Sequence, residues 1–233
     1  MTVVAFYGKL PGTGDFLYHR VPKSVLRPLE DWLAKGMTAA RESLGDGWAD
    51  VFDAAPPWRF WIGDSLAGQT VTGVMIPSRD RVGRRFPALG FWASEVAGLA
   101  PGPPVLDADP ESYGRMEAGL YGLQGVPQGE VQGALEAFAP EIPGRAPPEL
   151  PREGFWAVGA PGSGEDGLNA LLNDAGPAEL LHAAATRSYW WTVGDRTQAP
   201  ALHAAQGFPD PVIFAWFLRG VGEHSFAMAN ETI

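Results

Sequence analysis

Cysteine is absent from the 233-residue sequence, which excludes disulfides, thiolate metal sites and cysteine nucleophiles and leaves the redox compartment open. An apolar run long enough to span a bilayer is absent as well. The longest apolar run near the C-terminus, residues 212–218, is far shorter than the about twenty residues that a membrane-spanning helix needs. Residues 1–9 lack both the basic start and the small-residue cleavage pattern of a secretory signal. We therefore expect a cytoplasmic protein without membrane insertion.

Basic residues are in the minority, with 17 Lys and Arg against 27 Asp and Glu and a net charge of −10. A protein of this charge repels nucleic acid, and we expect none as a partner. The glycine run at 159–167 contains a serine but does not fit the nucleophile elbow. Four dispersed histidines give no local metal pair: His19, His182, His203 and His224. We expect no cofactor, no metal site and no enzymatic activity.

Apolar and aromatic residues are plentiful, at 45% hydrophobic content with 9 Trp and 12 Phe, and they indicate a globular core. Their spacing predicts strands at 3–10, 58–62, 69–76 and 88–93 and a helix from Ser24 to Gly45. The last three strands are joined by connections too short for helical crossovers, so the sheet should be antiparallel. We expect an α+β fold, an antiparallel β-sheet flanked by α-helices.

Proline-rich stretches at 100–110 and 139–151 flank a helix expected at about 110–138. Beyond residue 151 the pattern predicts a strand at 154–158, helical pieces at 168–185, a strand at 189–193 and a last helix at 211–219. We therefore expect one domain over residues 1–233, with a helical insertion at about 100–150 that could give it two lobes.

A polar segment follows the first expected strand: Gly8-Lys9-Leu10-Pro11-Gly12-Thr13-Gly14-Asp15-Phe16, here called the glycine segment. It is not a phosphate-binding loop, because its lysine comes first, Pro11 removes an N–H donor and Asp15 would repel an anion. Two interpretations stay open. It is either a rigid turn that glycine conformations permit, or a loop that binds a partner at the sheet edge.

A second polar segment, residues 77–87, contains four arginines in seven positions and is here called the arginine segment: Arg79, Arg81, Arg84 and Arg85, with Asp80 among them. One aspartate cannot neutralise four arginines. The surplus predicts either an internal network with a carboxylate elsewhere, such as Asp15, or a site for a partner's acidic or phosphorylated surface. Because a strand precedes each segment, we expect both at one end of the sheet. The candidate site residues are Lys9, Asp15, Arg79, Asp80, Arg81, Arg84 and Arg85.

The two segments, with Trp58-Arg59-Phe60 between them and the run from Ser188 to Thr192 near the end, resemble the TagF family of bacterial type VI secretion systems. The patterns GKLPxxGDF and PSxDxVGRRFP are complete, and the similarity runs from about residue 5 to about residue 220. The resemblance implies a longin- or profilin-like sheet. It also implies a non-enzymatic, cytoplasmic, post-translational repressor of secretion-system assembly, which in some systems contacts the forkhead-associated scaffold protein Fha.

Two other functions remain open from the residues alone. Asp15 and Asp80 with the neighbouring arginines have the groups of a metal-assisted phosphoryl hydrolase, although carboxylates so diluted with arginine would bind a metal weakly. Alternatively, the chain is a structural subunit of a larger assembly. The sequence leaves the oligomeric state and the partner's binding surface undetermined.

Overall fold

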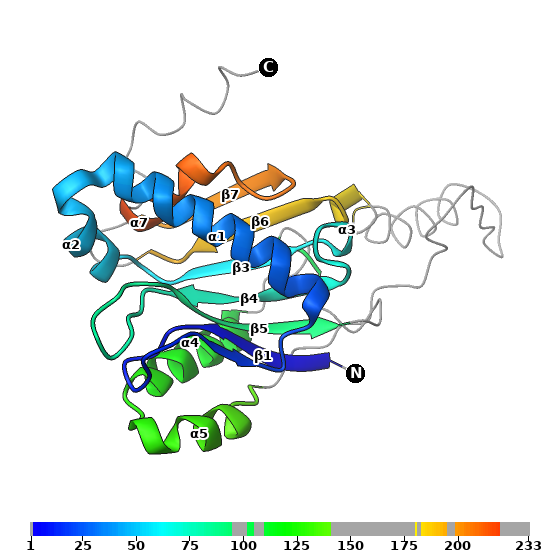
Figure 1. Ribbon diagram of the computed structural model, residues 1–233. Coiled ribbons are helices and arrows are strands. Elements are labelled where there is room, and N and C mark those ends of the chain that lie inside the picture. Colours follow the sequence, from blue (N-terminus) through cyan, green and yellow to red (C-terminus); the bar gives the residue numbers. More distant parts are fainter. Residues whose placement is uncertain are drawn as a thin grey trace, which may run out of the picture.

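A seven-stranded antiparallel sheet forms the centre of the computed structural model, which describes residues 2–94, 102–104, 110–140, 180, 183–194 and 199–219. Its strands lie in the order β2-β1-β5-β4-β3-β6-β7. Their bounds are Thr2–Gly8 (β1), Leu17–His19 (β2), Trp58–Ile62 (β3), Thr70–Ile76 (β4), Ala88–Ser94 (β5), Arg187–Thr192 (β6) and Ala201–Gln206 (β7). In Figure 1 the strands follow one another from β7 at the top to β1 at the bottom, and α1 crosses in front of them. The expected α+β fold is confirmed.

The strand register brings two connections to one end of the sheet. Ala88, the first residue of β5, lies opposite Gly8 at the end of β1 and opposite Ile76 at the end of β4. The chain therefore leaves β1 and β4 at the same end of the sheet. The loop after β1 and the β4–β5 connection lie at this end of the molecule, on the left in Figure 1.

One face of the sheet is covered by α1 (Lys23–Leu44), together with α2 (Trp48–Asp53), α3 (Asp64–Ala67) and α7 (Phe214–Arg219). The helix α1 buries residues spaced three and four apart, among them Val25, Leu29, Trp32 and Met37, as an amphipathic helix requires. At Gly36 the absence of a side chain admits the Phe214 ring, which would lie 2.9 Å from a Cβ. Single-turn 3₁₀ helices lie at Gly45–Gly47 and Pro211–Ile213.

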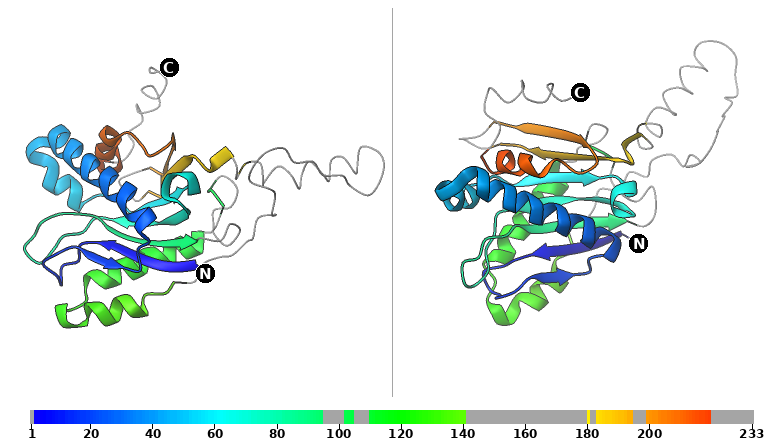
Figure 2. Two further views of the ribbon diagram at one scale, coloured as in Figure 1. Left: turned by 45° about the vertical axis from the view of Figure 1, so that its right-hand side comes forward. Right: turned by 45° about the horizontal axis from the view of Figure 1, so that its top comes forward.

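The opposite face is covered by α4 (Pro110–Gln124) and α5 (Val131–Ala137), with a 3₁₀ turn at Gln128–Glu130 between them. Figure 2 shows α1 and this helix pair on the two sides of the sheet. Met116 and Leu120 of α4 pack over Gly90, and a Cβ there would meet the Met116 sulfur at 2.6 Å. Because both faces are buried, strands such as β3 are apolar at nearly every position.

The strands expected at 3–10, 58–62, 69–76, 88–93 and 189–193 and the helix from Ser24 are confirmed. Three expectations need correction. The helix expected at 110–138 is two helices, because Gly125 and Pro127 interrupt it. The strands β2 and β7 have no counterpart among the expected elements. The helix expected at 211–219 begins as a 3₁₀ turn. The strand at 154–158, the glycine run at 159–167 and most of 168–185 lie outside the described residues. The single domain with an insertion stays a prediction.

Candidate functional site

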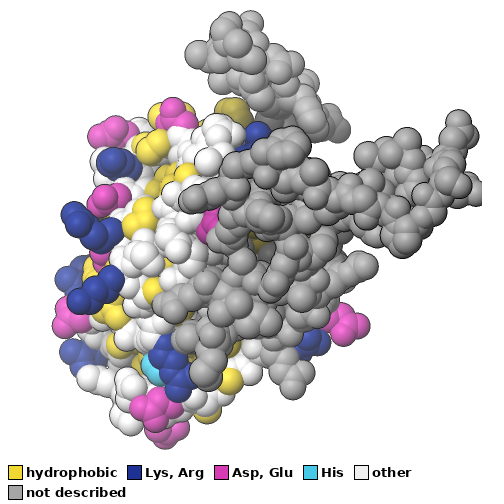
Figure 3. Space-filling model, turned by 90° about the vertical axis from the view of Figure 1, so that its right-hand side faces the viewer, with side chains coloured by type: hydrophobic (Ala, Val, Ile, Leu, Met, Phe, Trp, Pro, Cys, Tyr) yellow, Lys and Arg dark blue, Asp and Glu magenta, His cyan; other side chains and the backbone are white. Residues whose placement is uncertain are grey.

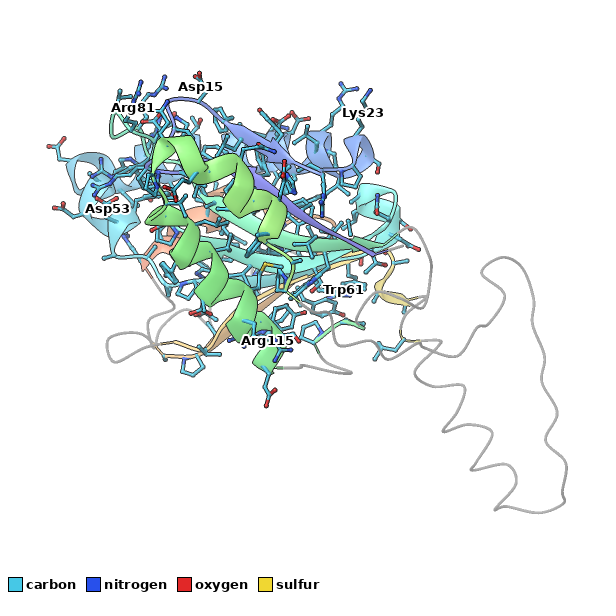
Figure 4. The ribbon with its side chains drawn as sticks, turned by 90° about the horizontal axis from the view of Figure 1, so that it is seen from below. Asp15, Lys23, Asp53, Trp61, Arg81 and Arg115 are labelled. Carbon is cyan, nitrogen blue, oxygen red and sulfur yellow. The ribbon has the colours of Figure 1, made fainter. Side chains whose placement is uncertain are left out.

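The glycine and arginine segments lie side by side. Arg81 N donates to the Thr13 carbonyl at 2.7 Å, and Ser78 Oγ donates to the Lys9 carbonyl at 2.7 Å. Figure 4 places Asp15, Arg81 and Asp53 at one end of the molecule and Lys23 and Trp61 towards the other. The predicted juxtaposition is confirmed.

Asp80 is the centre of the polar contacts between the segments. Its carboxylate is fully buried and accepts four hydrogen bonds. Oδ2 accepts from Lys9 Nζ at 3.0 Å and from Arg84 Nε at 2.6 Å. Oδ1 accepts from the backbone N–H groups of Val82 at 3.1 Å and Arg84 at 2.8 Å. The Lys9 side chain is 8% exposed, so the two segments share a buried ion pair.

The surroundings of Asp80 act on its pKa in two directions. Burial raises the pKa, because a charged carboxylate loses its hydration. The hydrogen bonds from Lys9 and from the Arg84 backbone and side chain outweigh this effect and hold the pKa of Asp80 well below its usual range. The carboxylate is therefore ionised at neutral pH, and its four acceptor positions are filled.

The arginine segment folds into a tight hairpin around this carboxylate. Asp80 N donates to the Arg84 carbonyl at 3.1 Å, and Gly83 N donates to the Asp80 carbonyl at 3.0 Å. Gly83 has a φ of 84°, a conformation that favours glycine. The Arg84 guanidinium donates to the Gly14 carbonyl and lies 4.0 Å from Asp15. Arg84 thus pairs with Asp80 inside its own segment and reaches Asp15 in the glycine segment, as the internal-network interpretation predicts.

Arg85 turns away from this network and forms two parallel hydrogen bonds with Asp53 at the end of α2, at 2.8 and 2.7 Å. This fork-to-fork geometry is the strong form of an arginine–carboxylate contact. The side chains are 26% and 41% exposed, so the pair ties the hairpin to α2 without full burial. Asp53 was not among the predicted site residues.

A third segment, the last residue of α4 with the α4–α5 connection, also contacts the two loops. Gln124 Nε2 donates to the Pro77 carbonyl at 2.7 Å, and Arg81 Nη1 donates to Gln128 Oε1 at 2.8 Å. The Val126 carbonyl lies against Gly12, where a Cβ would approach it to 2.7 Å. This segment was not among the predicted site residues. Its only sequence signal is the Gly125–Pro127 break in the expected helix.

Around this buried framework lies an exposed surface of arginines and apolar side chains. Arg79 and Arg81 are exposed, and Arg84 is 59% exposed. Val82 is 67% exposed at the tip of the hairpin, and Phe16 is partly exposed over the Lys9 ammonium, which lies 4.9 Å from its ring centre. We call these five residues the arginine surface: Phe16, Arg79, Arg81, Val82 and Arg84.

The predicted site residues thus divide into three groups. Lys9 and Asp80 are buried and paired, Arg85 is half-buried and paired with Asp53, and the others are exposed: Asp15, Arg79, Arg81 and Arg84. Within the described part of the chain, Arg79 forms no ion pair. The internal network and an exposed cationic surface therefore coexist.

Arg59, the centre of the Trp58-Arg59-Phe60 motif, lies apart from this site, on the α4 face of the sheet. Its guanidinium is 3.7 Å from Glu117 and lies over the Tyr113 ring at 5.6 Å. Burial raises the pKa of Glu117, and Arg59 acts in the opposite direction. Tyr113 OH is 2.6 Å from the Thr72 hydroxyl of β4. This motif therefore attaches α4 to the sheet.

The chemistry of the site suits anion recognition more than metal binding. Asp80 has no free acceptor position, and Asp15 is exposed beside an arginine. Over the ranges that the structure describes, no three His, Asp or Glu residues lie close enough to hold a metal ion. In the same ranges, no helix has the length and apolar character needed to cross a bilayer.

Comparison with known proteins identifies the protein family to which this fold and site belong. Residues 5–123 match the family model of the TagF N-terminal domain, described as type VI secretion system-associated. The chain shares 32% sequence identity with PA0076 from Pseudomonas aeruginosa PAO1. Its fold is similar to the crystal structure of that protein, with a TM-score of 0.76, and the match covers 95% of this chain and 96% of that one. No curated protein matches the chain. The chain is a type VI secretion system-associated protein. It belongs to the TagF family, as its two loop segments indicated.

Proposed function

We propose that this chain represses type VI secretion by binding a component of the secretion system in the cytoplasm, one to one and without catalysis. One observation carries the proposal: the buried charges of the two segments pair with each other and hold an exposed arginine surface in place. A metal-assisted hydrolase would need carboxylates with free acceptor positions. Here the buried carboxylate is fully used in fixing the loop.

The arginine surface has the chemistry of a docking site for an acidic partner. Arg79 and Arg81 are exposed, and the Arg81 guanidinium donates a hydrogen bond to the neutral Gln128. Guanidinium groups bind carboxylates or phosphates through two parallel hydrogen bonds. In Figure 3, which is turned towards the opposite end of the molecule, the basic side chains along the left margin lie among acidic ones. We take the forkhead-associated scaffold Fha as the first partner to test, because the TagF resemblance implies it.

The hydrolase alternative is disfavoured by the state of Asp80. A metal ion would have to replace hydrogen bonds from Lys9 and Arg84, and it would meet their positive charges. A structural subunit is distinguished from a repressor by the phenotype of its loss. Removing a repressor raises secretion, whereas removing a structural subunit abolishes it.

The test reverses charge on the arginine surface without touching the buried framework. Arg79→Glu with Arg81→Glu should abolish binding to purified Fha and release secretion in cells. The matched control is Lys23→Glu with Arg27→Glu, two exposed residues of α1 that give the same change in net charge. Both proteins should unfold within about 1 kcal/mol of the wild type, because exposed charges contribute little to stability.

If the arginine variant is folded and still represses, the partner surface lies elsewhere. If the α1 control also releases secretion, the effect is one of net charge rather than of this site.

A further inference from the structure

Val82 occupies an unusual position at the tip of the arginine hairpin. It is 67% exposed, and its backbone N–H is held by Asp80 Oδ1 at 3.1 Å. The turn closes at Gly83, whose N–H donates to the Asp80 carbonyl at 3.0 Å. Because Asp80 is itself fixed by Lys9, the position of this side chain is set before any partner arrives.

Single exposed apolar residues are common, so exposure alone says little. Val212 provides the comparison, since it is 64% exposed and its N–H donates to Asp210 Oδ1 at 3.0 Å. Val212 stands between Pro211 and Ile213 in the sequence. Val82 follows an exposed arginine, at the tip of a hairpin that carries two more. The two valines share their local geometry and differ in their surroundings.

Protein-binding surfaces usually combine a desolvated apolar core with a polar rim, and arginine is enriched in them relative to the rest of the surface. A residue held in its bound conformation also loses less entropy on association. Val82 meets both conditions, because a buried carboxylate fixes its turn and the same hairpin carries three exposed arginines.

We propose that Val82 is the apolar anchor of this surface and inserts into an apolar pocket on the partner. The rim of that pocket carries carboxylates that pair with Arg79, Arg81 and Arg84. The partner is thus a protein with an acid-rimmed apolar pocket, rather than a uniformly acidic surface. This inference rests on the proposed function, because it specifies what the arginine surface recognises.

The size of the effect follows from burial of one valine side chain. Full burial of such a side chain is worth about tenfold or more in affinity. Val82→Ser should therefore weaken repression and partner binding by about tenfold or more, because it places a hydroxyl in the apolar pocket. Val212→Ser, the matched control, should leave both unchanged. Neither substitution should shift the unfolding midpoint appreciably, because both side chains are largely exposed.

A second measurement detects proximity. A photoreactive diazirine amino acid is placed at position 82 or at position 212 in cells that assemble the secretion system. Position 82 should cross-link to one secretion-system protein, at a site where apolar residues lie beside Asp or Glu, and position 212 should not. The cross-link should disappear in the Arg79→Glu and Arg81→Glu background.

The outcomes separate this inference from the proposed function. If charge reversal releases secretion but Val82→Ser represses like the wild type, the anchor is wrong and the arginine surface stands. The anchor is also wrong if positions 82 and 212 cross-link equally. If charge reversal itself has no effect, the proposed function fails at this surface and the anchor fails with it.

Discussion

Replacing Asp80 by asparagine tests the buried framework most directly. The substitution keeps the size of the side chain but removes the charge that Lys9 and Arg84 share. Lys9, with 8% of its side chain exposed, would keep a buried ammonium without a counter-charge. The new amide nitrogen would also present N–H donors to groups that are donors themselves. We therefore expect asparagine to be far from a neutral replacement here.

The magnitude follows from the burial of the pair. Removing one partner of a buried ion pair costs about 3–5 kcal/mol, a large part of the about 5–15 kcal/mol by which domains are stable. For a chain of this size, 1 kcal/mol corresponds to about 2–4 °C in the unfolding midpoint. Asp80→Asn should therefore lower the midpoint by about 6–20 °C in a calorimetric or circular dichroism melt.

Two further variants make the measurement decisive. Asp15→Asn removes an exposed carboxylate 4.0 Å from Arg84 and should cost less than about 1 kcal/mol. Adding Lys9→Met to Asp80→Asn removes the unpaired charge and should recover part of the loss, because apolar replacements of buried pairs are often tolerated. The reasoning is refuted if Asp80→Asn melts with the wild type, or if Asp15→Asn is equally damaging.

Three other predictions follow from the same end of the molecule. Because the folded-state pKa of Asp80 is depressed, its contribution to stability is full above about pH 4 and is lost as the pH falls further. The free energies of unfolding of the wild type and Asp80→Asn should accordingly converge below pH 4 in acid titrations, and a constant gap would contradict this origin. Gly8→Ala should destabilise the protein by more than about 1 kcal/mol in urea unfolding, because φ is 138° and the new Cβ would lie 2.2 Å from the Pro87 carbonyl; wild-type stability would show that the loop relaxes. Calorimetric titration with ATP or GTP, with and without Mg²⁺, should give no micromolar binding, and phosphatase and esterase screens should stay at background. Binding or turnover that Asp80→Ala abolishes would favour the hydrolase.

The sequence predicts the fold best where local pattern is sufficient. The alternation of apolar residues and turn signals locates β1, α1 and β3 to β5 within a few residues. It misses β7, Ala201–Gln206, because alanine has little preference for strands. That segment becomes a strand by pairing with β6, where Trp191 lies opposite Leu202. β2 has three residues, too few for any period to appear.

The candidate site also has features that the sequence predicts and features that it does not. The adjacency of the glycine and arginine segments is predictable, because each follows a strand and these two strands terminate at the same end of the sheet. The individual partners are not predictable: Lys9 and Asp80 are 71 positions apart, Arg85 and Asp53 are 32 apart, and Arg81 and Gln128 are 47 apart. Charge shows that arginines need partners, but it does not say which carboxylate the fold brings to each one.

The contacts of the α4–α5 connection bear on how this protein can be dissected. The matched family region ends at residue 123, whereas the first of these contacts comes from Gln124, the last residue of α4, which donates to the Pro77 carbonyl. The carbonyl over Gly12 and the amide that holds Arg81 follow at Val126 and Gln128. An expression fragment that stops where the family match stops would keep the glycine and arginine segments and lose the contacts that support them. The family match therefore ends before the contacts that support the two loops, and fragments for binding studies should extend through α5.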